Sequence, residues 1–390
     1  MNHNILILCE GIWSLSKNAG VTSLKRLIDS INLENHITLF IPQKEDVDCY
    51  SMKALNIRSY NVKNRYLSYA LDVKKWLYTN FMFVIYGLHL NEKPDLIYIS
   101  SDLPSVAGYI LSRYYNVPYV QRQYGTFLRK KLGSFVAKLK SFREVISYML
   151  PANAFVITDD GTYGDEVAAY YNIPDERVFF WRNGVDKPLL DNKNIVREDI
   201  RRAYGIKSND IIVMSVSRLV NWKRVDRIIK AFNGIDRKNV YYFVIGDGAE
   251  RENLESLSIN DNCIFVGAIP NDKVREYMLA CDIFVSMYDL TNLGNPLLEA
   301  LSSGMPIITL DTGNTSSVFD GQNMIILPVS GESKIVDNLR DTMIELIDNP
   351  RKRNLLSENA ATYAEKNIPS WEERIDREKC LILKLIDDSN

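Results

Sequence analysis

The second half of the chain alternates short apolar runs with amphipathic stretches, and this alternation limits the fold more than any other feature. From residue 211 the apolar runs are IIVMSVSRL, YYFVIGDG, CIFVGAI, DIFVSMYD, PIITL and MIILPV. Segments such as VDRIIKAF and DKVREYMLA lie between them. Strands that are apolar throughout are typical of a parallel sheet covered by helices on both faces. The pattern therefore predicts a doubly wound α/β domain.

The first half repeats this pattern less regularly. Strands are predicted near ILILCEG, HITLFIP, DLIYISSD, PYVQRQYG and AFVITDD, with helices after Gly20, around 65–90 and from Pro104. Since 390 residues exceed one ordinary core, we expect two domains. The polar segment 183–194 marks the break, and we place the domains at 1–187 and 188–370. We expect two Rossmann-like domains facing across a cleft, with ligands at the carboxyl ends of the strands.

Composition fits a globular protein, at 46% hydrophobic and 25% charged residues. No basic segment precedes the first strand, and FMFVIYGLHL is too short to span a bilayer, so we expect neither a signal peptide nor a membrane span. Five cysteines, odd in number and without CxxC spacing, argue against disulfides and zinc. We expect a cytoplasmic protein.

Charge is divided unevenly along the chain. Residues 1–190 contain 22 Lys and Arg against 18 Asp and Glu, whereas the remainder contains 25 against 31. The stretch 122–143, RQYGTFLRKKLGSFVAKLKSFR, carries seven Lys and Arg and no acid, interleaved with apolar residues. It is either a solvated basic helix or an interfacial helix on anionic lipid, which would make the protein peripheral on the inner face of a membrane. The acidic second half argues against nucleic acid.

A loop and a short helix follow the strand in DIFVSMYD. Gly294 and Asn295 would allow unusual backbone angles, Pro296 suits the first helical position, and Gly304 before Pro306 ends the helix after about two turns. We expect the N–H groups of 296–298 to face the cleft, where they favour a phosphate or another anion by up to roughly 2 kcal/mol.

Glu299 is the one carboxylate on this apolar helix. One interpretation is that the helix dipole tolerates it in the first turn. The other, which we prefer, is that it accepts two hydroxyls such as those of a ribose, because an unpaired carboxylate in apolar surroundings is costly.

Two cations follow the first strand of the second domain, in SVSRLVNWKRVDRIIKAF. Arg218 stands at the strand end and Lys223 at the start of the next helix. Such cations can hold a diphosphate, with charge-assisted bonds of roughly 1.5 to 3 kcal/mol each. The alternative is a solvated helix start, which is disfavoured because a lysine in a first turn opposes the dipole.

Other motifs are weak. GDGAER at 246–251 lacks the third glycine of a dinucleotide fingerprint, so we predict a tight turn and no NAD. DVD at 46–48 and TDDG at 158–161 are more simply acidic turns than metal ligands. The three histidines have no partner at ligand or triad spacing. We therefore predict no metal and no cofactor beyond a substrate.

These elements, in this order, resemble the retaining GT-B glycosyltransferases of family 4. The likeness rests on Arg218, Leu219 and Lys223, on GDG at 246–248, VG at 266–267, ACDIFV at 280–285 and PLLEA at 296–300, and on RNGVD at 182–186 and SWEE at 370–373. The resemblance implies that the final helix, 371–390, crosses back onto the first domain.

The resemblance also implies roles for individual residues. Arg218 and Lys223 would bind the donor diphosphate and act in catalysis, Glu299 would bind the nucleotide ribose, and Tyr124 replaces a His that faces the sugar. Further donor contacts would come from Gly20, Gly267, Thr291, Asn292, Gly294, Asn295 and Leu298. The chain departs from the family at Thr291, where a second Glu is usual.

The predicted activity is metal-independent, retaining transfer of a hexose from a nucleoside diphosphate donor, with a UDP-sugar favoured. The acceptor would be a hydroxyl of a glycan or a lipid-linked molecule in surface polysaccharide synthesis. Two alternatives remain open at this stage: a catalytically impaired GT-B-like partner subunit, suggested by Thr291, and a sugar-nucleotide epimerase.

Overall fold

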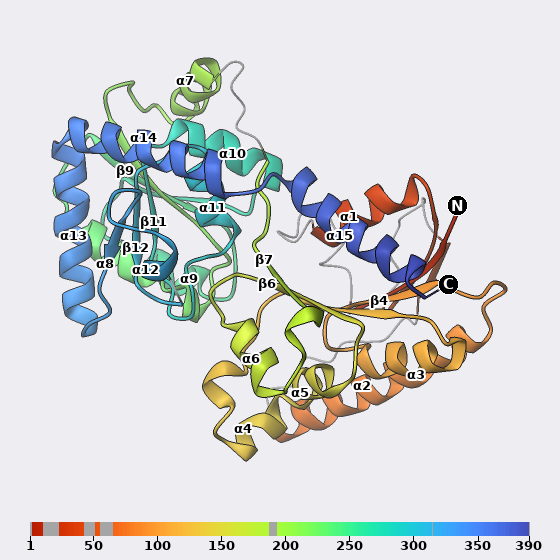
Figure 1. Ribbon diagram of the computed structural model, residues 1–390. Coiled ribbons are helices and arrows are strands. Elements are labelled where there is room, and N and C mark those ends of the chain that lie inside the picture. The colour runs from red at the N-terminus through yellow and green to blue at the C-terminus, as the bar shows by residue number, and fades with distance from the viewer. Residues whose placement is uncertain are drawn as a thin grey trace. The chain divides into compact units, whose positions relative to one another are not determined.

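A computed structural model describes residues 2–10, 23–42, 51–54, 65–186, 193–313 and 315–389. The chain forms two compact units (Figure 1). The N-terminal unit comprises 1–159, 163–182 and 372–390, and the C-terminal unit comprises 160–162 and 183–371. This division falls a few residues before our predicted boundary at 187 and assigns the short turn 160–162 to the C-terminal unit.

The N-terminal unit is built on one parallel sheet in the order β3-β2-β1-β4-β5-β6-β7. Its strands are β1 (Asn4–Cys9), β2 (His36–Ile41), β3 (Ser51–Ala54), β4 (Leu96–Ser100), β5 (Tyr119–Gln123), β6 (Ala154–Thr158) and β7 (Val178–Trp181). Five of these were predicted, whereas the edge strands β3 and β7 were not. The order reverses between β1 and β4, as it does in Rossmann-like sheets.

Helices cover this sheet on both faces. They are α1 (Ser23–Asn32), α2 (Arg65–Leu88), α3 (Ser105–Tyr115), α4 (Phe135–Lys140), α5 (Phe142–Met149) and α6 (Gly164–Tyr170), with short 3-10 turns at Arg129–Lys131 (η2) and Asp175–Arg177 (η3). The predicted helices around 65–90 and from Pro104 are confirmed as α2 and α3. Within the described residues no helix is long and apolar enough to cross a membrane.

The last helix, α15 (Trp371–Asp387), belongs to the N-terminal unit from Glu372 onward, which confirms the predicted return of the chain. Figure 1 shows α15 beside α1, and Lys379 Nζ lies 3.1 Å from the Glu34 carboxylate just after α1. Deeper in the unit, the buried Glu378 accepts hydrogen bonds from Tyr98 Oη of β4 and from Arg374. These contacts attach the end of the chain to its first sheet.

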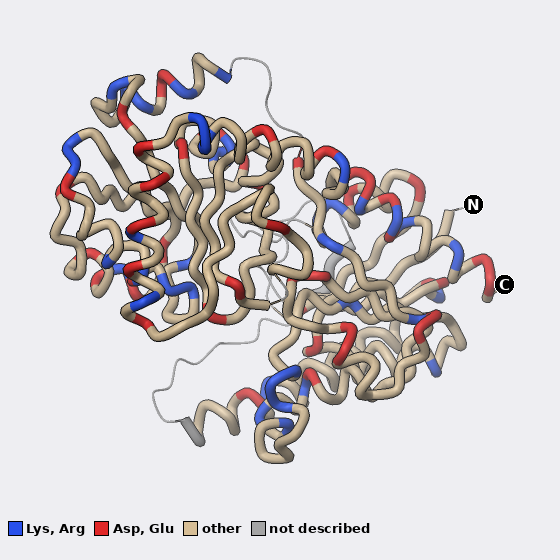
Figure 2. Tube along the Cα trace, turned by 60° about the vertical axis from the view of Figure 1, so that its left-hand side comes forward, with Lys and Arg blue, Asp and Glu red and all other residues tan. Residues whose placement is uncertain are grey.

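The C-terminal unit repeats the plan with the sheet order β10-β9-β8-β11-β12-β13, again all parallel. The strands are β8 (Ile211–Val216), β9 (Val240–Ile245), β10 (Cys263–Gly267), β11 (Ile283–Ser286), β12 (Ile307–Leu310) and β13 (Ile325–Leu327). None contains a charged residue, so these strands are tan in Figure 2. All six were predicted from their apolar sequences.

The helices of this unit are amphipathic and cover both faces of the sheet. They are α7 (Lys193–Ala203), α8 (Val225–Asn233), α9 (Arg251–Leu257), α10 (Asn271–Ala280), α11 (Asn295–Ser302), α12 (Thr315–Val318), α13 (Glu332–Asp348) and α14 (Pro350–Asn367), with a 3-10 turn at Asn221–Lys223 (η4). One buried cluster includes Ile228 of α8 and Leu339 of α13, and a second includes Leu298 of α11 and Ala360 of α14. Both units are therefore Rossmann-like, as predicted.

Candidate functional site

The strand order of the C-terminal unit reverses between β8 and β11, which are adjacent and parallel. In open α/β sheets, ligands bind outside the carboxyl ends of the strands at such a reversal. The segments that leave these two strand ends are 217–224 and 287–294. The predicted cations stand on the first segment, and the second leads into α11.

Arg218 lies two residues beyond the end of β8 with an exposed side chain. Its backbone is held from both sides, because Ser217 N–H donates to Ile245 O at 3.0 Å and Leu219 N–H donates to Asp247 O at 2.9 Å. The guanidinium of Arg218 forms no hydrogen bond or ion pair with any residue that the structure describes. The backbone at Arg218 is therefore fixed, while its guanidinium has no hydrogen-bond or ion-pair partner among the described residues.

The GDG turn at 246–248 supports this segment through its glycines. Gly246 has φ of +131°, and a Cβ there would lie 1.8 Å from Ser217 O. A Cβ on Gly248 would lie 2.3 Å from Leu219 O. Both positions need glycine because backbone approaches backbone at these points. The prediction of a tight strand-to-helix turn is confirmed, and its role is to support the segment that carries Arg218.

Lys223 is the last residue of η4 and precedes α8, rather than standing in the first turn of that helix as predicted. Its ammonium nitrogen lies 4.1 Å from the centroid of the Trp222 ring and 3.7 Å from that of Tyr288. A cation over aromatic faces is attracted by their electron density. Tyr288 is itself fixed, because its hydroxyl donates to Val216 O at 2.8 Å.

The surroundings of Lys223 disfavour its charge. Burial, and then the nearby charge of Arg218, lower the pKa of Lys223 to about 7, while Asp160 acts in the opposite direction. Desolvation and like charge both penalise the ammonium form. A bound anion would relieve both effects, so Arg218 and Lys223 together form a positive site suited to an anionic ligand.

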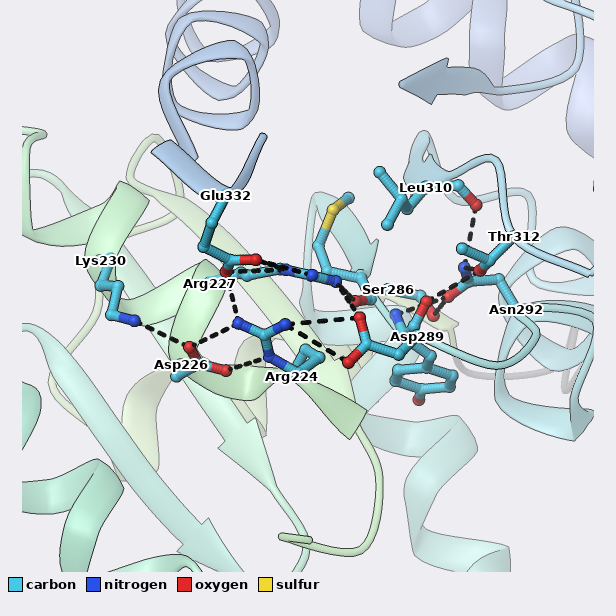
Figure 3. Close-up of polar contacts among 12 residues, drawn as sticks. Arg224, Asp226, Arg227, Lys230, Ser286, Asp289, Asn292, Leu310, Thr312 and Glu332 are labelled. Atoms are coloured by element: carbon cyan, nitrogen blue, oxygen red, sulfur yellow. Dashed lines mark hydrogen bonds and ion pairs between the residues drawn. The ribbon is translucent and has the colours of Figure 1, made fainter. Parts of the chain in front are cut away.

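An ion-pair network, shown in Figure 3, fixes the two loops against each other. The buried Arg227 of α8 lies 2.7 Å from the Asp289 carboxylate, donates to Met287 O at 2.9 Å and to Glu332 at 2.8 Å. Arg224 also contacts Asp289 and Glu332. Asp289 N–H in turn donates to Trp222 O at 3.0 Å. We call these four charged residues the Arg224–Glu332 network.

The pKa values of Glu332 and of the neighbouring Asp226 agree with these ion pairs. Hydrogen bonds from Arg227, and then from Arg224, lower the pKa of Glu332 despite some burial. At Asp226 burial acts to raise the pKa, but hydrogen bonds from Arg224 and Lys230 outweigh it and bring the pKa to about 2. Because Glu332 and Asp226 are charged near neutral pH, they neutralise Arg224 and Arg227 within the protein.

Asn292 does not have the role that we predicted. Its side chain is fully buried, and Oδ1 accepts from Ser286 Oγ at 2.5 Å and from Tyr288 N–H at 3.1 Å (Figure 3). Its Nδ2 donates to Leu310 O at 2.9 Å and to Thr312 Oγ1 at 2.7 Å. The side-chain amide of Asn292 therefore uses both N–H donors and both lone pairs of its oxygen within the protein. Asn292 shapes the loop and cannot also bind a sugar hydroxyl.

Thr291 is likewise engaged within the C-terminal unit. Its hydroxyl donates to Asp160 O at 2.5 Å and accepts from Leu293 N–H at 3.1 Å. A Cβ added at Gly161 would lie 2.4 Å from this hydroxyl, and one at Gly313 would lie 2.7 Å away. Thr291 therefore fills a tight space between two turns, where the longer Glu usual in the family would not fit without movement.

The start of α11 differs from our prediction. The helix begins at Asn295, Pro296 has no N–H, and the N–H groups of Leu297 and Leu298 donate to Gly294 O at 3.1 and 3.4 Å. The expectation that the N–H groups of 296–298 are available is therefore wrong. Leu298 is 1% exposed and belongs to the core, so its side chain does not reach a ligand. The predicted end of α11 is confirmed, because Gly304 follows it with φ of +66°.

Gly294 adopts ordinary backbone angles, with φ of −77° and ψ of 169°, so the wider conformational freedom that glycine allows is not used here. A Cβ there would meet only Pro296 Cδ, at 3.8 Å. Neither backbone strain nor described packing requires glycine at this position. Close approach of a ligand is a remaining reason for glycine.

Glu299 is the fifth residue of α11, beyond the first turn, and is half-buried between buried neighbours. The dipole explanation, which requires the first turn, is therefore weakened. Asn295 accepts a hydrogen bond from Asn183 Nδ2 at 2.8 Å. Asn183 precedes Gly184, where a Cβ would lie 2.6 Å from the backbone of Ser370 and Trp371. The segment 183–185 is thereby fixed beside the start of α11.

The remaining predicted residues lie elsewhere. Gly267 ends β10 with φ of +85°, and its carbonyl accepts from Gly246 N–H at 2.8 Å, so it supports the GDG turn. Tyr124 belongs to the N-terminal unit, where its hydroxyl bonds Ser100 Oγ at 2.8 Å and burial raises its pKa to about 12. Gly20 lies outside the described residues, as does the DVD segment at 46–48.

The acidic turn at 158–161 is occupied by contacts within the protein. Asp159 pairs with Arg182 at 2.6 Å, and Asp160 Oδ1 accepts from Thr162 Oγ1 at 2.6 Å. Across the part of the chain that the structure describes, no group of three or more His, Cys, Asp or Glu side chains is arranged to hold a metal ion.

Sequence reasoning missed the two aromatic rings at Lys223 and the Arg224–Glu332 network. One signal was available: Tyr288 follows directly after an apolar strand, at the edge where ligands bind, and Trp222 adjoins Lys223. Nothing in the sequence connects Glu332 with Arg227, since 105 positions separate them.

Two Rossmann-like units in one chain are the architecture of the GT-B fold. HepE of Anabaena, solved in complex with UDP and glucose, superposes with a TM-score of 0.71 at 16% identity, over 98% of this chain and 100% of that one. At this identity the likeness establishes the fold alone.

Sequence comparison finds similar proteins for the C-terminal unit. Residues 196–363 match the model of glycosyl transferases group 1. An uncharacterized glycosyltransferase of Methanocaldococcus jannaschii is 24% identical over 58% of this chain and 60% of its own length. A putative teichuronic acid biosynthesis glycosyltransferase, TuaC of Bacillus subtilis, is 26% identical over 62% and 59%. The chain thus matches about three-fifths of the length of these relatives.

Proposed function

We propose that this protein is a glycosyltransferase that moves a sugar from a nucleoside diphosphate donor to an acceptor hydroxyl, with retention at the anomeric carbon. The observation that carries the proposal is the pair Arg218 and Lys223. One guanidinium has no described anionic partner, and one ammonium has a pKa lowered to about 7, both at the strand reversal of a Rossmann-like unit. A diphosphate supplies the negative charge that this pair lacks.

In the proposed mechanism, catalysis consists mainly of stabilising the leaving diphosphate. As the bond between the anomeric carbon and the diphosphate oxygen breaks, negative charge grows on the diphosphate, and Arg218 and Lys223 stabilise it there. The departing oxygen then takes the proton of the acceptor hydroxyl while that hydroxyl bonds the same face of the sugar. These two side chains supply the positive charge, so the proposed reaction is metal-independent.

Glu299 and Asn295 are proposed to bind the nucleotide ribose and the donor sugar. Glu299 is half-buried on α11, and Asn295 begins that helix next to Gly294, where an added Cβ would meet only Pro296 Cδ, at 3.8 Å. Two ribose hydroxyls can donate to one carboxylate. Tyr124 and Gly20 remain proposed contacts on the acceptor side and at the donor, respectively.

UDP is the favoured nucleotide, and a glycan or lipid-linked molecule of surface polysaccharide synthesis is the favoured acceptor. The first choice is supported by HepE, whose solved complexes contain UDP, and the second by the name of TuaC. Both are analogies from other proteins.

Calorimetry with UDP, GDP and ADP tests the donor proposal directly. We expect UDP to bind to the wild-type chain and to bind at least tenfold more weakly to an Arg218→Ala variant. Hydrolysis of a bound UDP-sugar without acceptor, followed by NMR of the released anomer, tests transfer with retention. Release of the inverted anomer, or failure of all three nucleotides to bind, would refute the proposal.

A second candidate is a GT-B-like partner subunit that binds nucleotide without transferring sugar. It is favoured by Thr291, whose hydroxyl is committed to Asp160 O and Leu293 N–H where the family usually has a second carboxylate. Tight UDP binding without any hydrolysis or transfer across a panel of sugar nucleotides would favour it.

A further inference from the structure

Exposed apolar side chains gather in one part of the N-terminal unit. Nineteen large hydrophobic residues are exposed in the part of the chain that the structure describes, and thirteen of them fall between residues 67 and 149. Single exposed apolar residues are ordinary, but a contiguous concentration marks a surface that binds something.

Helix α2 contributes the longest part of this concentration. Leu67, Lys74, Leu77, Phe81 and Leu88 are exposed and follow one another at intervals of three, four or seven residues, and Tyr78 lies among them. Residues at these intervals share one face of a helix.

The opposite face of α2 is occupied by the protein core. Phe83 is buried, Asn80 donates to Leu103 O at 2.9 Å, and a Cβ on Gly87 would overlap Leu111 of α3. The helix therefore has two apolar faces, of which the fold covers one.

Helix α4 extends this surface. Tyr69 Oη of α2 donates to Leu139 O of α4 at 3.1 Å, and Tyr69 and Trp76 both contact the ring of Phe142 at the start of α5. Three apolar residues of α4 are exposed, among them Phe135 at 72%. We define the α2–α4 surface as Leu67, Lys74, Leu77, Tyr78, Phe81 and Leu88 of α2, Lys130 of η2, and Phe135, Val136, Leu139 and Lys140 of α4.

The charge on this surface is positive. Lys74, Lys130 and Lys140 are exposed and form no ion pair with a described residue, whereas α4 contains no acid and α2 contains only Asp72. Figure 2 shows Lys and Arg along the segment of η2 and α4 at the lower end of the N-terminal unit. Lysines beside exposed Phe, Leu and Tyr complement a binding partner that has negative charge at its surface and an apolar interior beneath it.

The stretch 122–143 is not the single basic helix that we considered from the sequence. It divides into the end of β5, η2, α4 and the start of α5. Arg122 is 1% exposed and lies near Glu378, and Arg143 pairs with Glu10 and Asp102. The available lysines come from η2, α4 and α2.

We propose that the α2–α4 surface docks on an anionic lipid bilayer, with α2 lying flat and its exposed apolar residues inserted between headgroups. Lysines near such a surface gain from its negative potential, and Tyr and Phe suit the interfacial region. A second copy of this chain is a poorer occupant, because a two-fold contact would place the same lysines against each other. The inference does not depend on the proposed transferase activity.

Flotation of the full chain with vesicles tests this proposal. Vesicles of phosphatidylcholine alone are compared with vesicles containing 30% phosphatidylglycerol, a composition that we choose for the assay. One variant removes apolar area, Leu77→Ser with Phe81→Ser, and one reverses charge, Lys130→Glu with Lys140→Glu. The matched controls change exposed residues of the C-terminal unit, Ile259→Ser with Leu355→Ser and Lys334→Glu with Lys366→Glu.

We expect the wild-type chain and both controls to float with the anionic vesicles, and both test variants to lose at least tenfold in bound fraction. UDP binding should be the same in all five proteins, which separates failure of this inference from failure of the proposed function. Equal binding to both vesicle types, equal loss in the controls, or no flotation of the wild type would overturn the proposal. Concentration-dependent dimerisation that the two test variants abolish would also overturn it in favour of self-association.

Discussion

The ammonium nitrogen of Lys223 lies 3.7 Å from the centre of the Tyr288 ring, and the two residues come from loops after adjacent parallel strands. The contact orients the lysine by an aromatic face, while the nearby Asp160 acts to raise its pKa. An acid at that place would neutralise Lys223 and compete with an anionic ligand. An aromatic ring fixes the side chain and leaves its charge for the ligand.

Replacing Lys223 with Met should weaken UDP binding by roughly 10- to 100-fold, since one charge-assisted bond contributes about 1.5 to 3 kcal/mol. If the protein transfers sugar, kcat/KM should fall about a hundredfold. Calorimetry and initial rates measure the two effects, with Lys334→Met as the exposed control. Wild-type affinity and turnover in the Lys223 variant would refute its assignment.

UDP affinity should fall as pH rises above about 7. The pKa of Lys223 is lowered to about 7 in the free protein, so the side chain is charged below that pH and neutral above it. A bound diphosphate favours the charged form, so binding above pH 7 must take up a proton. Affinity measured from pH 7.5 to 9 should decline by up to tenfold per unit, where the phosphates are already ionised.

The Lys223→Met variant is the control for this titration, because its affinity should not change with pH over the same range. Proton uptake can be read separately from the dependence of the binding enthalpy on buffer. A wild-type affinity that is constant from pH 7.5 to 9 would show that Lys223 is not the group that meets the phosphates.

Gly246→Ala should both destabilise the protein and abolish UDP binding. The added Cβ would lie 1.8 Å from Ser217 O at φ of +131°, so the backbone beside Arg218 must move. We expect a loss of about 3 kcal/mol or more in the free energy of unfolding. Gly321→Ala is the control, because a Cβ there meets nothing within 4 Å. Equal stability of the two variants in urea would contradict this account.

Much of the fold could be predicted from the sequence because its strands are buried on both faces. Such strands are apolar throughout, as IIVMSV of β8 shows, and they contrast with the helices between them. The edge strand β7 (VFFW) is apolar, but its 4 residues are too few to show the period of either a strand or a helix, so it escaped prediction.

The candidate site was predictable where a residue type has one chemical use. A cation at a strand end, such as Arg218, indicates a binding site for an anion in most contexts. Amides are different, because Asn292 can bind either a ligand or other groups of the protein, and only the structure shows that its four hydrogen bonds are made within the protein. The N–H groups of α11 were misjudged because their use depends on where the helix begins.

Asn292 and Asn295 should respond differently to replacement by Ala. Asn292→Ala leaves buried groups such as Tyr288 N–H and Leu310 O without partners, so we expect a loss of about 2 to 4 kcal/mol in the free energy of unfolding. Asn295→Ala should cost less than about 1 kcal/mol, yet should weaken binding of a UDP-sugar about fivefold if it contacts the donor. Urea denaturation and calorimetry separate these outcomes, and the reverse pattern would exchange the two roles.

Arg227→Met tests whether the Arg224–Glu332 network holds the loops around Lys223. Removing the buried guanidinium leaves Asp289 and Glu332 with less neutralisation and frees Met287 O. Breaking a fully buried ion pair costs about 3 to 5 kcal/mol, but both carboxylates here are 43–45% exposed, so we expect about 2 kcal/mol.

The second effect of Arg227→Met should be on the ligand, although Arg227 does not face it. Asp289 N–H bonds Trp222 O, so a displaced 287–289 segment moves the ring of Tyr288 away from Lys223. UDP affinity should fall several-fold, and its decline with pH should begin at a lower pH, because loss of the aromatic contact further disfavours the ammonium form. Arg340→Met, which removes a surface arginine with two acidic partners, should change neither. An unchanged pH profile in the Arg227 variant would mean that the network stabilises the fold without positioning Lys223.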